Sequence, residues 1–377
     1  MAEALKNMYS ADFIFGLAND ISGISNVSRD AFQALVFDEM WGSRELKERG
    51  RHIARCLHQV IPGSFEEQVK PLYDVAQNYS GYTAIIFSDF VELFGLNHWA
   101  SSMEAMEVFT QRCTAEFAVR PFFKLDFERM VMQHLHWSKS TNEHIRRLAS
   151  EGIRPRLPWG AGIPRLKKEP EHIFPILENL MMDDSEYVRR SVANNLNDIS
   201  KDYPELVLDF VKDRDLNHRN TQRLVKHALR GLLKKAHPEA LALFGFHDSV
   251  ELSHVVLNTA QSSIQLGETL NWNFSLEAKG SGKLRLEYHV HYQKANGKTS
   301  VKVFQLSEQS IEGFKKLGMD KKLSFQDLST RKHYPGMHRI VLVANGKDVG
   351  EVEVSAFAEK AHTSADASVH RLADGES

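Results

Sequence analysis

The sequence predicts a mainly α-helical protein, in which a HEAT-like repeat α-solenoid (residues 1–245) precedes a small antiparallel immunoglobulin-like β-sandwich (residues 250–358). Two observations lead to this fold class. From Ser28 to about Phe244 apolar residues recur at helical spacing almost without interruption. After Phe246, short stretches alternate apolar and polar residues between turn signals, which is typical of strands.

The helical part consists of amphipathic segments separated by prolines, glycines or short polar stretches. The predicted helices span residues 28–41, 44–60, 65–77, 83–94, 101–112, 115–123, 127–135, 142–150, 170–181, 185–200, 204–212, 218–235 and 238–244. An irregular stretch, 152–168, interrupts them, because its prolines and glycines do not allow a helix to continue.

These helices repeat with a period in the mid-thirties. An arginine, a valine and a leucine recur one repeat later: Arg190, Val192 and Leu196 return as Arg223, Val225 and Leu229. Paired helices at such a period are typical of an α-solenoid of the HEAT kind. The inner helices of a solenoid line a concave surface, which would suit a peptide or a nucleic-acid duplex equally well.

The C-terminal part is predicted to form about seven short strands. They are predicted at 251–258, 263–278, 283–293, 299–306, 323–329, 338–344 and 350–358, and the turn signals between them include Gly280-Ser281-Gly282 and Asn345-Gly346. No Cys–Trp–Cys spacing is present, so the domain is not of the antibody type. We expect the tail, 359–377, to be disordered, because it has no periodicity.

Composition narrows the function classes. A net charge of −2 argues against a polycationic nucleic-acid coat but allows a locally basic cleft. The N-terminus does not resemble a signal peptide, and no apolar run approaches about 18 residues, so we expect a cytoplasmic protein without a membrane span. Phosphate-binding glycine loops, nucleophile elbows and metal-ligand spacings are absent, so we expect no cofactor and no metal.

The helix predicted at 185–200 carries the first candidate site. Ser185 suits its N-cap, and one face shows an apolar stripe. A second stripe is polar and consists of Arg190, Asn194, Asn197 and Asp198. Asparagine is a poor helix former, so several of them in a strong helix indicate function, and we place Asp198 at the centre of a site. The alternative is a solvated polar face.

A second candidate is Glu116, which lies between aromatic residues and could be partly desolvated. The alternative is an ordinary surface pair with Arg120, four residues later. Glu143, Arg147 and Glu151 form a further ladder at four-residue spacing, which alone would indicate a solvated helix face.

The ladder leads into the irregular stretch 152–168. This stretch places cations, namely Arg154, Arg156, Arg165, Lys167 and Lys168, around the isolated Trp159. One aromatic among cations suits base stacking and phosphate contacts. The alternative is a connector between repeats whose tryptophan fills the core.

Several motifs together resemble the bacterial AlkC-type alkylpurine DNA glycosylases, HEAT-repeat base-excision repair enzymes related to the AlkD type. They are LKNMYS, GRHIARCLHQVIPG, TAEFAVRPFF, NEHIRRLASEGIRPRLPWG and VRRSVANNLNDISKDYPE, over about residues 1–245. TRKHYPGMHRI extends the resemblance into the immunoglobulin-like module of longer AlkC proteins.

The resemblance implies a monofunctional glycosylase that removes 3-methyladenine and 3-methylcytosine from double-stranded DNA, without a cofactor and without base flipping. It implies that Glu116 and Asp198 are catalytic, and that Arg147, Glu151 and Trp159 shape the lesion pocket. An oxocarbenium-like transition state would be stabilised by such carboxylates.

The expected partner is double-stranded DNA containing alkylated bases, bound by a monomer. In the helical part we expect DNA contacts from Arg120, Arg154, Arg156, Arg190 and Asn194. In the C-terminal part we expect them from one loop: Arg331, Lys332, His333 and Tyr334. That loop could instead be a solvated turn. The competing function is a non-catalytic HEAT-repeat scaffold that binds DNA or protein, in which Glu116 and Asp198 would be exposed and far apart.

Overall fold

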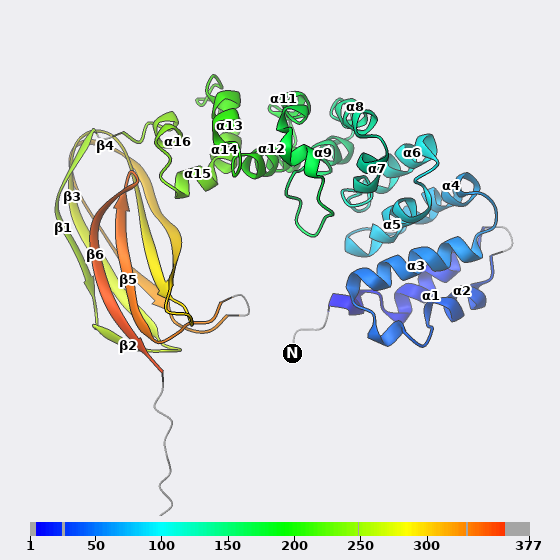
Figure 1. Cartoon of the computed structure of the whole chain (residues 1–377), viewed down its shortest axis with the longest axis horizontal. Helices are drawn as coiled ribbons and strands as arrows, with labels where there is room; N and C mark the ends of the chain where they lie inside the picture. The colour runs from blue at the N-terminus through cyan, green and yellow to red at the C-terminus, as the bar shows by residue number, and fades with distance from the viewer. Residues whose placement is uncertain (1–4, 25–26, 248, 329–330, 359–377) are drawn as a thin grey trace, which may run out of the picture. The chain divides into compact units, whose positions relative to one another are not determined.

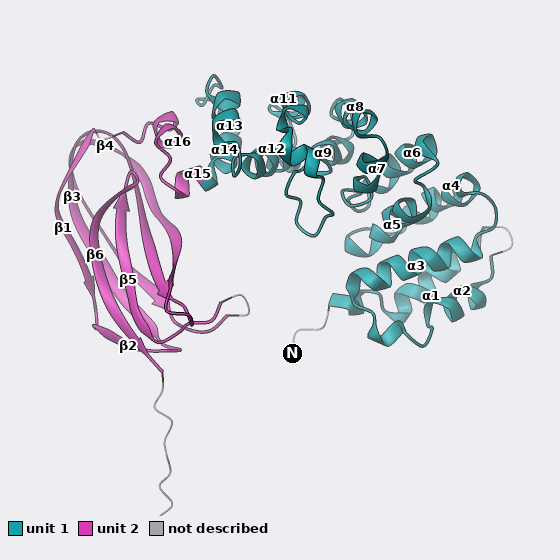
Figure 2. Ribbon diagram, in the orientation of Figure 1, with its two compact units in different colours: residues 1–231 teal, residues 232–377 magenta. Residues whose placement is uncertain are grey.

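The computed structural model describes residues 5–24, 27–247, 249–328 and 331–358, so the predicted tail lies outside the described residues. The chain divides into two compact units, Met1–Gly231 and Leu232–Ser377 (Figure 2). We call them the helical unit and the β unit and describe each by itself. The division after Gly231 groups the last helical segment with the strands, whereas the sequence analysis placed the boundary at residue 245.

The helical unit is built from α-helices joined by short loops and 3₁₀ turns (Figure 1). The α-helices are α1 (Ala11–Ile21), α2 (Arg29–Val36), α3 (Leu46–Val60), α4 (Phe65–Ala76), α5 (Ile85–Phe94), α6 (Trp99–Phe109), α7 (Arg120–Leu125), α8 (Phe127–Trp137), α9 (Glu143–Glu151), α10 (Pro164–Lys168), α11 (Phe174–Leu180), α12 (Glu186–Ile199), α13 (Pro204–Val211) and α14 (Arg219–Ala228). The 3₁₀ turns are η1 (Leu5–Met8), η2 (Trp41–Ser43), η3 (Tyr82–Ala84) and η4 (Pro170–His172). The helix α15 (Arg230–Lys234) spans the division between the units.

The mainly helical fold with a C-terminal sheet is confirmed, with differences in detail. The sequence analysis did not predict α1, nor α10 within the irregular stretch. The helix predicted at 115–123 begins only at Arg120, after a series of turns. The long helix predicted at 218–235 is divided at Leu229 into α14 and α15.

Helix packing brings the candidate residues into neighbouring positions. Helix α12 packs against α9 on one side and α14 on the other, and α3 packs against α5. The apolar stripe of α12, which includes Val188, Val192 and Leu196, is fully buried. Burial of such a stripe contributes more to helix stability than local propensity, so the polar residues of α12 can be used for other purposes. The HEAT-like repeat itself stays a prediction.

The β unit contains α16 (Pro238–Leu243) and one six-stranded sheet. The strands are β1 (Val250–Thr259), β2 (Ser263–Gln265), β3 (Thr269–Gln293), β4 (Thr299–Ser324), β5 (Gly336–Ala344) and β6 (Lys347–Phe357). Their order is β1-β3-β5-β6-β2, and β4 pairs along the whole length of β3. Strand β2 runs parallel to β6, whereas the other pairs are antiparallel.

The predicted turn at 280–282 is wrong, because β3 runs straight through it. Gly280 pairs with Val250 of β1 and with Gly313 of β4. Both glycines have positive φ values, 126° and 78°, so they change the direction of the paired strands without ending them. The predicted strands 299–306 and 323–329 are accordingly connected by one long strand, which runs to Ser324.

The two halves of β3 share one hydrophobic core. Trp272 and Leu276 from its first half belong to the same buried cluster as Leu286 and Val290 from its second half. Strand β1 pairs with the first half and β5 with the second. The long β3–β4 ribbon thus contributes both of its halves to a single core, while the predicted two-layer sandwich stays a prediction.

Candidate active site

A chain of buried ion pairs connects the two predicted catalytic carboxylates. Arg147 of α9 lies 2.7 Å from Glu116 (Nη1 to Oε2) and 3.6 Å from Glu151 (Nη2 to Oε1). Arg154, just after α9, lies 2.5 Å from Glu151 (Nη1 to Oε1) and 2.8 Å from Asp198 of α12 (Nη2 to Oδ2). We call these five residues the carboxylate–arginine network. The alternative of a surface pair between Glu116 and Arg120 is wrong.

Residues that the sequence analysis missed complete the network. Thr114 donates a hydrogen bond to Glu116 (2.9 Å) and accepts one from Arg147 (2.7 Å). Ser191 of α12 donates to the second oxygen of Glu151 (2.5 Å). Lys201 contacts the other oxygen of Asp198 at 3.1 Å. Hydroxyl donors and cations therefore surround all three carboxylates, as buried charge requires.

The polar face of α12 is buried, and it differs in part from the predicted one. Ser191, Asn195 and Asp198 form the buried row, in which Asn195 donates to the carbonyl of Ser150 at 2.8 Å. The spacing of seven residues between Ser191 and Asp198 is the signal that could have placed both on one face. Asn194 lies to the side and accepts from His227 of α14 and Arg230 of α15. The alternative of a solvated face is wrong for Asp198, which is 2% exposed.

Glu116 is electrostatically unusual. Burial raises the pKa of its carboxyl group, and the nearby negative charge of Glu151 raises it further. The guanidinium of Arg147 and the hydrogen bond from Thr114 oppose this rise but do not cancel it. A buried carboxylate with a raised pKa is a better proton acceptor than an ordinary glutamate, which is the property a general base needs.

The loop after α9, residues 152–163, presents Trp159 to solvent. Its side chain is 73% exposed, and its backbone has a positive φ of 63°, which is strained for a residue other than glycine. Lys47 of α3 donates to its carbonyl at 3.0 Å, and the same ammonium lies 4.5 Å from the Phe117 ring centroid. The alternative of a core-filling tryptophan is wrong, because this side chain is held outward.

Three of the predicted DNA contacts are wrong, because the side chains are buried and used inside the protein. Arg120 donates to the carbonyls of Ala161, Gly152 and Arg154, so it holds the two ends of the Trp159 loop. Arg154 is committed to the carboxylate–arginine network. In the β unit, the His333 ring packs against the core residues Tyr292 and Phe325. The sequence shows that a residue is basic, but not whether its side chain points into the protein or towards solvent.

Other predicted DNA contacts remain at the surface. Arg190 is exposed beside a hollow of about 230 Å³, which Arg189, Arg223 and His227 also line. Arg156 lies after α9 and pairs with Asp202 at 2.7 Å. In the β unit, a hollow of about 400 Å³ is lined mainly by polar and basic residues, among them Arg331, Lys332, Tyr334, Lys294 and Lys302.

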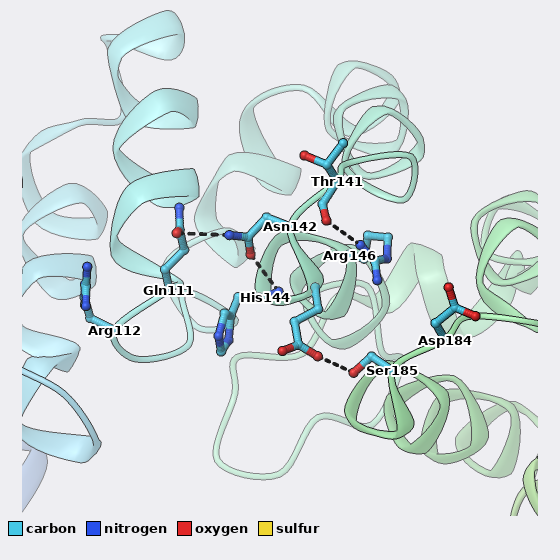
Figure 3. Close-up of a pocket in the computed structure, with 9 residues that line it drawn as sticks. Gln111, Arg112, Thr141, Asn142, His144, Arg146, Asp184 and Ser185 are labelled. Carbon is cyan, nitrogen blue, oxygen red and sulfur yellow. Dashed lines mark hydrogen bonds between the residues drawn. The ribbon is translucent and has the colours of Figure 1, made fainter.

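A hollow of about 750 Å³ lies elsewhere in the helical unit, at the N-terminal end of α9 (Figure 3). Its polar groups bind one another: Asn142 donates to Gln111 at 3.0 Å, and Arg146 donates to the carbonyl of Thr141 at 2.9 Å. Glu143 accepts from Ser185, which stands at the N-cap position of α12. None of the five network residues lines this hollow.

Among the residues that the structure describes, no group of three or more His, Cys, Asp or Glu side chains is placed to hold a metal ion. In the same part of the chain, no helix is both long and apolar enough to cross a membrane.

Comparisons with known proteins fit this geometry. The family model described as "DNA alkylation repair enzyme" matches residues 112–232, which include the whole carboxylate–arginine network. The model of the C-terminal Ig-like domain of the uncharacterised protein YhaZ matches residues 253–356. The chain is 42% identical over 344 residues to the uncharacterized protein YhaZ of Bacillus subtilis (strain 168), covering 91% of this chain and 96% of YhaZ.

A solved structure is similar over nearly the whole chain. It is that of the Pseudomonas fluorescens alkylpurine DNA glycosylase AlkC, bound to DNA containing an abasic site analogue. The TM-score is 0.89 at 33% sequence identity, and the match covers 94% of this chain and 100% of AlkC.

Proposed function

The chain belongs to the AlkC-type alkylpurine DNA glycosylases, and from this membership we propose that it excises cationic alkylated bases, 3-methyladenine and 3-methylcytosine, from duplex DNA. As a member of this family it is a DNA-repair glycosylase whose partner is DNA. The observation that supports the proposed substrates and mechanism is the buried network between Glu116 and Asp198, beside a loop that holds Trp159 in solvent.

The proposed reaction is hydrolysis of the N-glycosidic bond. The bond between C1′ and the base breaks with both electrons moving to the base, which leaves as a neutral molecule. A water oxygen then bonds to C1′ and releases a proton. Because the methylated base is cationic before cleavage, it leaves readily, and the remaining barrier is the oxocarbenium-like charge on the sugar. Neutral bases leave poorly, so the reaction discriminates against them without a specific pocket.

We assign different roles to the two carboxylates. Asp198 stabilises the positive charge that develops on the deoxyribose, as preorganised charges do in other active sites. Glu116 positions the water and accepts its proton, a role supported by the raised pKa of its carboxyl group. Arg147, Glu151 and Arg154 join the two carboxylates and hold them at a fixed distance, since each forms an ion pair with the next residue of the network.

Asp198 is covered on its solvent side by Lys201. The Lys201 side chain is 48% exposed, whereas that of Asp198 is 3% exposed. We propose that a DNA phosphate draws Lys201 away, which uncovers one carboxylate oxygen towards the sugar while Arg154 keeps the other in place. DNA binding would then increase the effective negative charge of the site at the moment it is needed.

Trp159 is proposed to contact the damaged base step without extruding the base. Its exposed ring stands on a loop that Arg120 and Lys47 hold from inside, so the ring is presented rigidly. The N3 methyl group lies in the minor groove, where an aromatic side chain can wedge against a step. Arg190, Arg156 and Asn194 are proposed to bind the DNA backbone, as are Arg331, Lys332 and Tyr334 in the β unit.

The competing scaffold function fits less well. It expects Glu116 and Asp198 to be exposed and unrelated, but they are buried and lie at the two ends of one ion-pair network. The test is a glycosylase assay of the full chain on duplexes containing a single 3-methyladenine or 3-methylcytosine. Release of the free base and formation of an alkali-labile abasic site would support the proposal. Tight binding of the same duplexes with no base release would favour the scaffold. The monomeric state and the cytoplasmic location stay predictions.

A further inference from the structure

A smaller cavity adjoins the Trp159 loop, and Trp159, Gly160 and Ala161 of this loop line it. Its volume is about 140 Å³, and its walls come from α3, α5, the start of α7 and the loop itself. The residues that matter here are Tyr9, Gly50, Asp89, Phe117 and Trp159. Of the residues assigned above to the lesion pocket or to catalysis, Trp159 is the member that also lines this cavity. We call it the Tyr9–Asp89 cavity.

The floor of the cavity presents two polar groups that nothing in the described chain uses. Tyr9 is 1% exposed, and its hydroxyl has no hydrogen-bond partner among the described residues. Asp89 is buried within the apolar helix α5, and in the same part of the chain no ion pair or hydrogen bond is found for its carboxylate. Buried polar groups are normally satisfied, so an unused donor and acceptor side by side indicate a place for a ligand.

Gly50 lets these two groups approach the backbone of α3 closely. A Cβ atom at this position would lie 2.9 Å from the Tyr9 hydroxyl and 3.3 Å from Asp89 Oδ2. Both groups thus converge on nearly the same spot beside a glycine of α3, where a larger residue would force one of them to move. Among the other charged residues of the cavity, Arg51 pairs with Glu92 at 2.9 Å, and Lys47 donates to the carbonyl of Trp159.

The rim of the cavity is aromatic. The rings of Phe117 and Trp159 both contact the Lys47 ammonium, at 4.5 Å and 5.6 Å from their centroids. A planar ring that entered between these walls would meet aromatic faces at the rim and hydrogen-bonding groups at the floor. This combination is typical of pockets that hold a nucleobase. At about 140 Å³ the cavity is small compared with pockets for drug-sized ligands, so a single planar ring is the size of ligand it suits.

The acid at the floor suits such a ligand at neutral pH. Burial raises the pKa of Asp89 to about 7, the negative charge of Glu92 adds to the rise, and Arg51, Lys47 and Arg55 oppose it. Its carboxyl group can therefore either donate or accept a hydrogen bond. An adenine-type edge offers one donor and one acceptor next to each other, so it could pair with Asp89 in either protonation state.

We propose that the Tyr9–Asp89 cavity holds the excised purine, such as 3-methyladenine, after the N-glycosidic bond has been broken. Asp89 and Tyr9 bind the hydrogen-bonding edge of the free base, and Trp159 covers its ring. Because Trp159 borders both the proposed lesion site and this cavity, the base has to pass a single side chain. The inference rests on the proposed glycosylase function. It adds a site for the product, which does not require the base to be flipped before cleavage.

The test measures binding of free 3-methyladenine to the full-length protein by calorimetry, in the absence of DNA. The variants are Asp89→Leu, which removes both the donor and the acceptor, Tyr9→Phe, and Asp74→Leu as a control for removal of an exposed carboxylate outside the cavity. Thermal unfolding and circular dichroism establish that each variant is folded. We expect wild type and Asp74→Leu to bind equally, and Asp89→Leu to bind about tenfold more weakly. Tyr9→Phe should lose severalfold.

Two results would overturn the inference: no measurable binding of the free base to the wild type, or equal affinities in all four folded proteins. The glycosylase assay on the same wild-type preparation separates this failure from a failure of the proposed function. Excision of 3-methyladenine without Asp89-dependent binding overturns only the product site. Binding of the free base without any excision overturns the proposed function, and with it the assignment of the ligand as a reaction product.

Discussion

The arginines of the carboxylate–arginine network in the helical unit and the cations of residues 331–334 in the β unit are used in opposite ways. Arg154 is buried and Arg147 is half-buried, and each contacts two carboxylates. Lys332 of the β unit is exposed, and Arg331 lies over the ring of Tyr292 at 5.0 Å at the edge of a basic hollow. Buried arginines hold reactive groups in position, whereas surface cations can attract phosphates. The comparison separates residues that should control chemistry from residues that should control affinity.

Removal of Arg154 should have the largest effect. Arg154→Met leaves the buried carboxylates of Glu151 and Asp198 without their shared cation, and we expect a loss of about 3–5 kcal/mol in the free energy of unfolding. Chemical denaturation measures it. The matched exposed change, Arg190→Met, should cost less than about 0.5 kcal/mol. Equal stabilities of the two variants would show that the network is not structurally important.

The pH dependence of excision should identify Glu116. Because burial raises the pKa of this carboxyl group, the single-turnover rate should fall on acidification at a pH above the ordinary range of glutamate. The loss would not reflect unfolding: a raised folded-state pKa means that the folded protein binds the proton more tightly, so acidification through this interval favours the folded state through Glu116. Glu116→Gln should be slow at all pH values and lack this limb. A wild-type rate that stays constant down to the ordinary pKa of glutamate would contradict the assignment.

Charge reversal in the β unit should change the affinity for DNA and have the smallest effect on the rate of excision. Arg331→Glu with Lys332→Glu should weaken DNA binding and reduce the slope of log affinity against log salt by about 0.9 for each lost phosphate contact. The rate of bound complexes and the unfolding free energy should not change. Lys315→Glu, an exposed residue of β4 outside the hollow, serves as the control. An unchanged salt slope in the double variant would remove this loop from the DNA interface.

The sequence was informative where a residue type conflicts with its local setting. Glu116 among aromatics and Asp198 in an asparagine-rich helix were both predicted as site residues, and the structure places them in one network. The same conflict exists at Asp89, an acid inside the apolar segment Ile85–Phe94, which the sequence analysis did not predict as a site residue. Conflicts of this kind can be read without knowing the fold.

The direction of a side chain and the continuity of a strand could not be predicted from the sequence. Arg154 lies in a basic, proline-rich stretch and Arg120 in an aromatic one, and both were predicted to contact DNA, yet tertiary packing turns both inward. Gly280-Ser281-Gly282 has the composition of a hairpin turn, but its neighbours β1 and β4 supply partners that keep β3 extended. Both errors have the same cause, because side-chain direction and strand pairing are decided by contacts between residues far apart in the sequence.

The central claim, that the two carboxylates joined by the network perform the excision, is tested most directly at Asp198. The measurement is the single-turnover rate of 3-methyladenine release at saturating protein, for wild type, Asp198→Asn, and Asp209→Asn as an exposed control. We predict a loss on the order of a hundredfold for Asp198→Asn, and no loss for the control. Adding Glu116→Gln should cost less than the product of the separate effects, since both groups act on one transition state. A folded Asp198→Asn protein that releases the base at the wild-type rate would contradict the account.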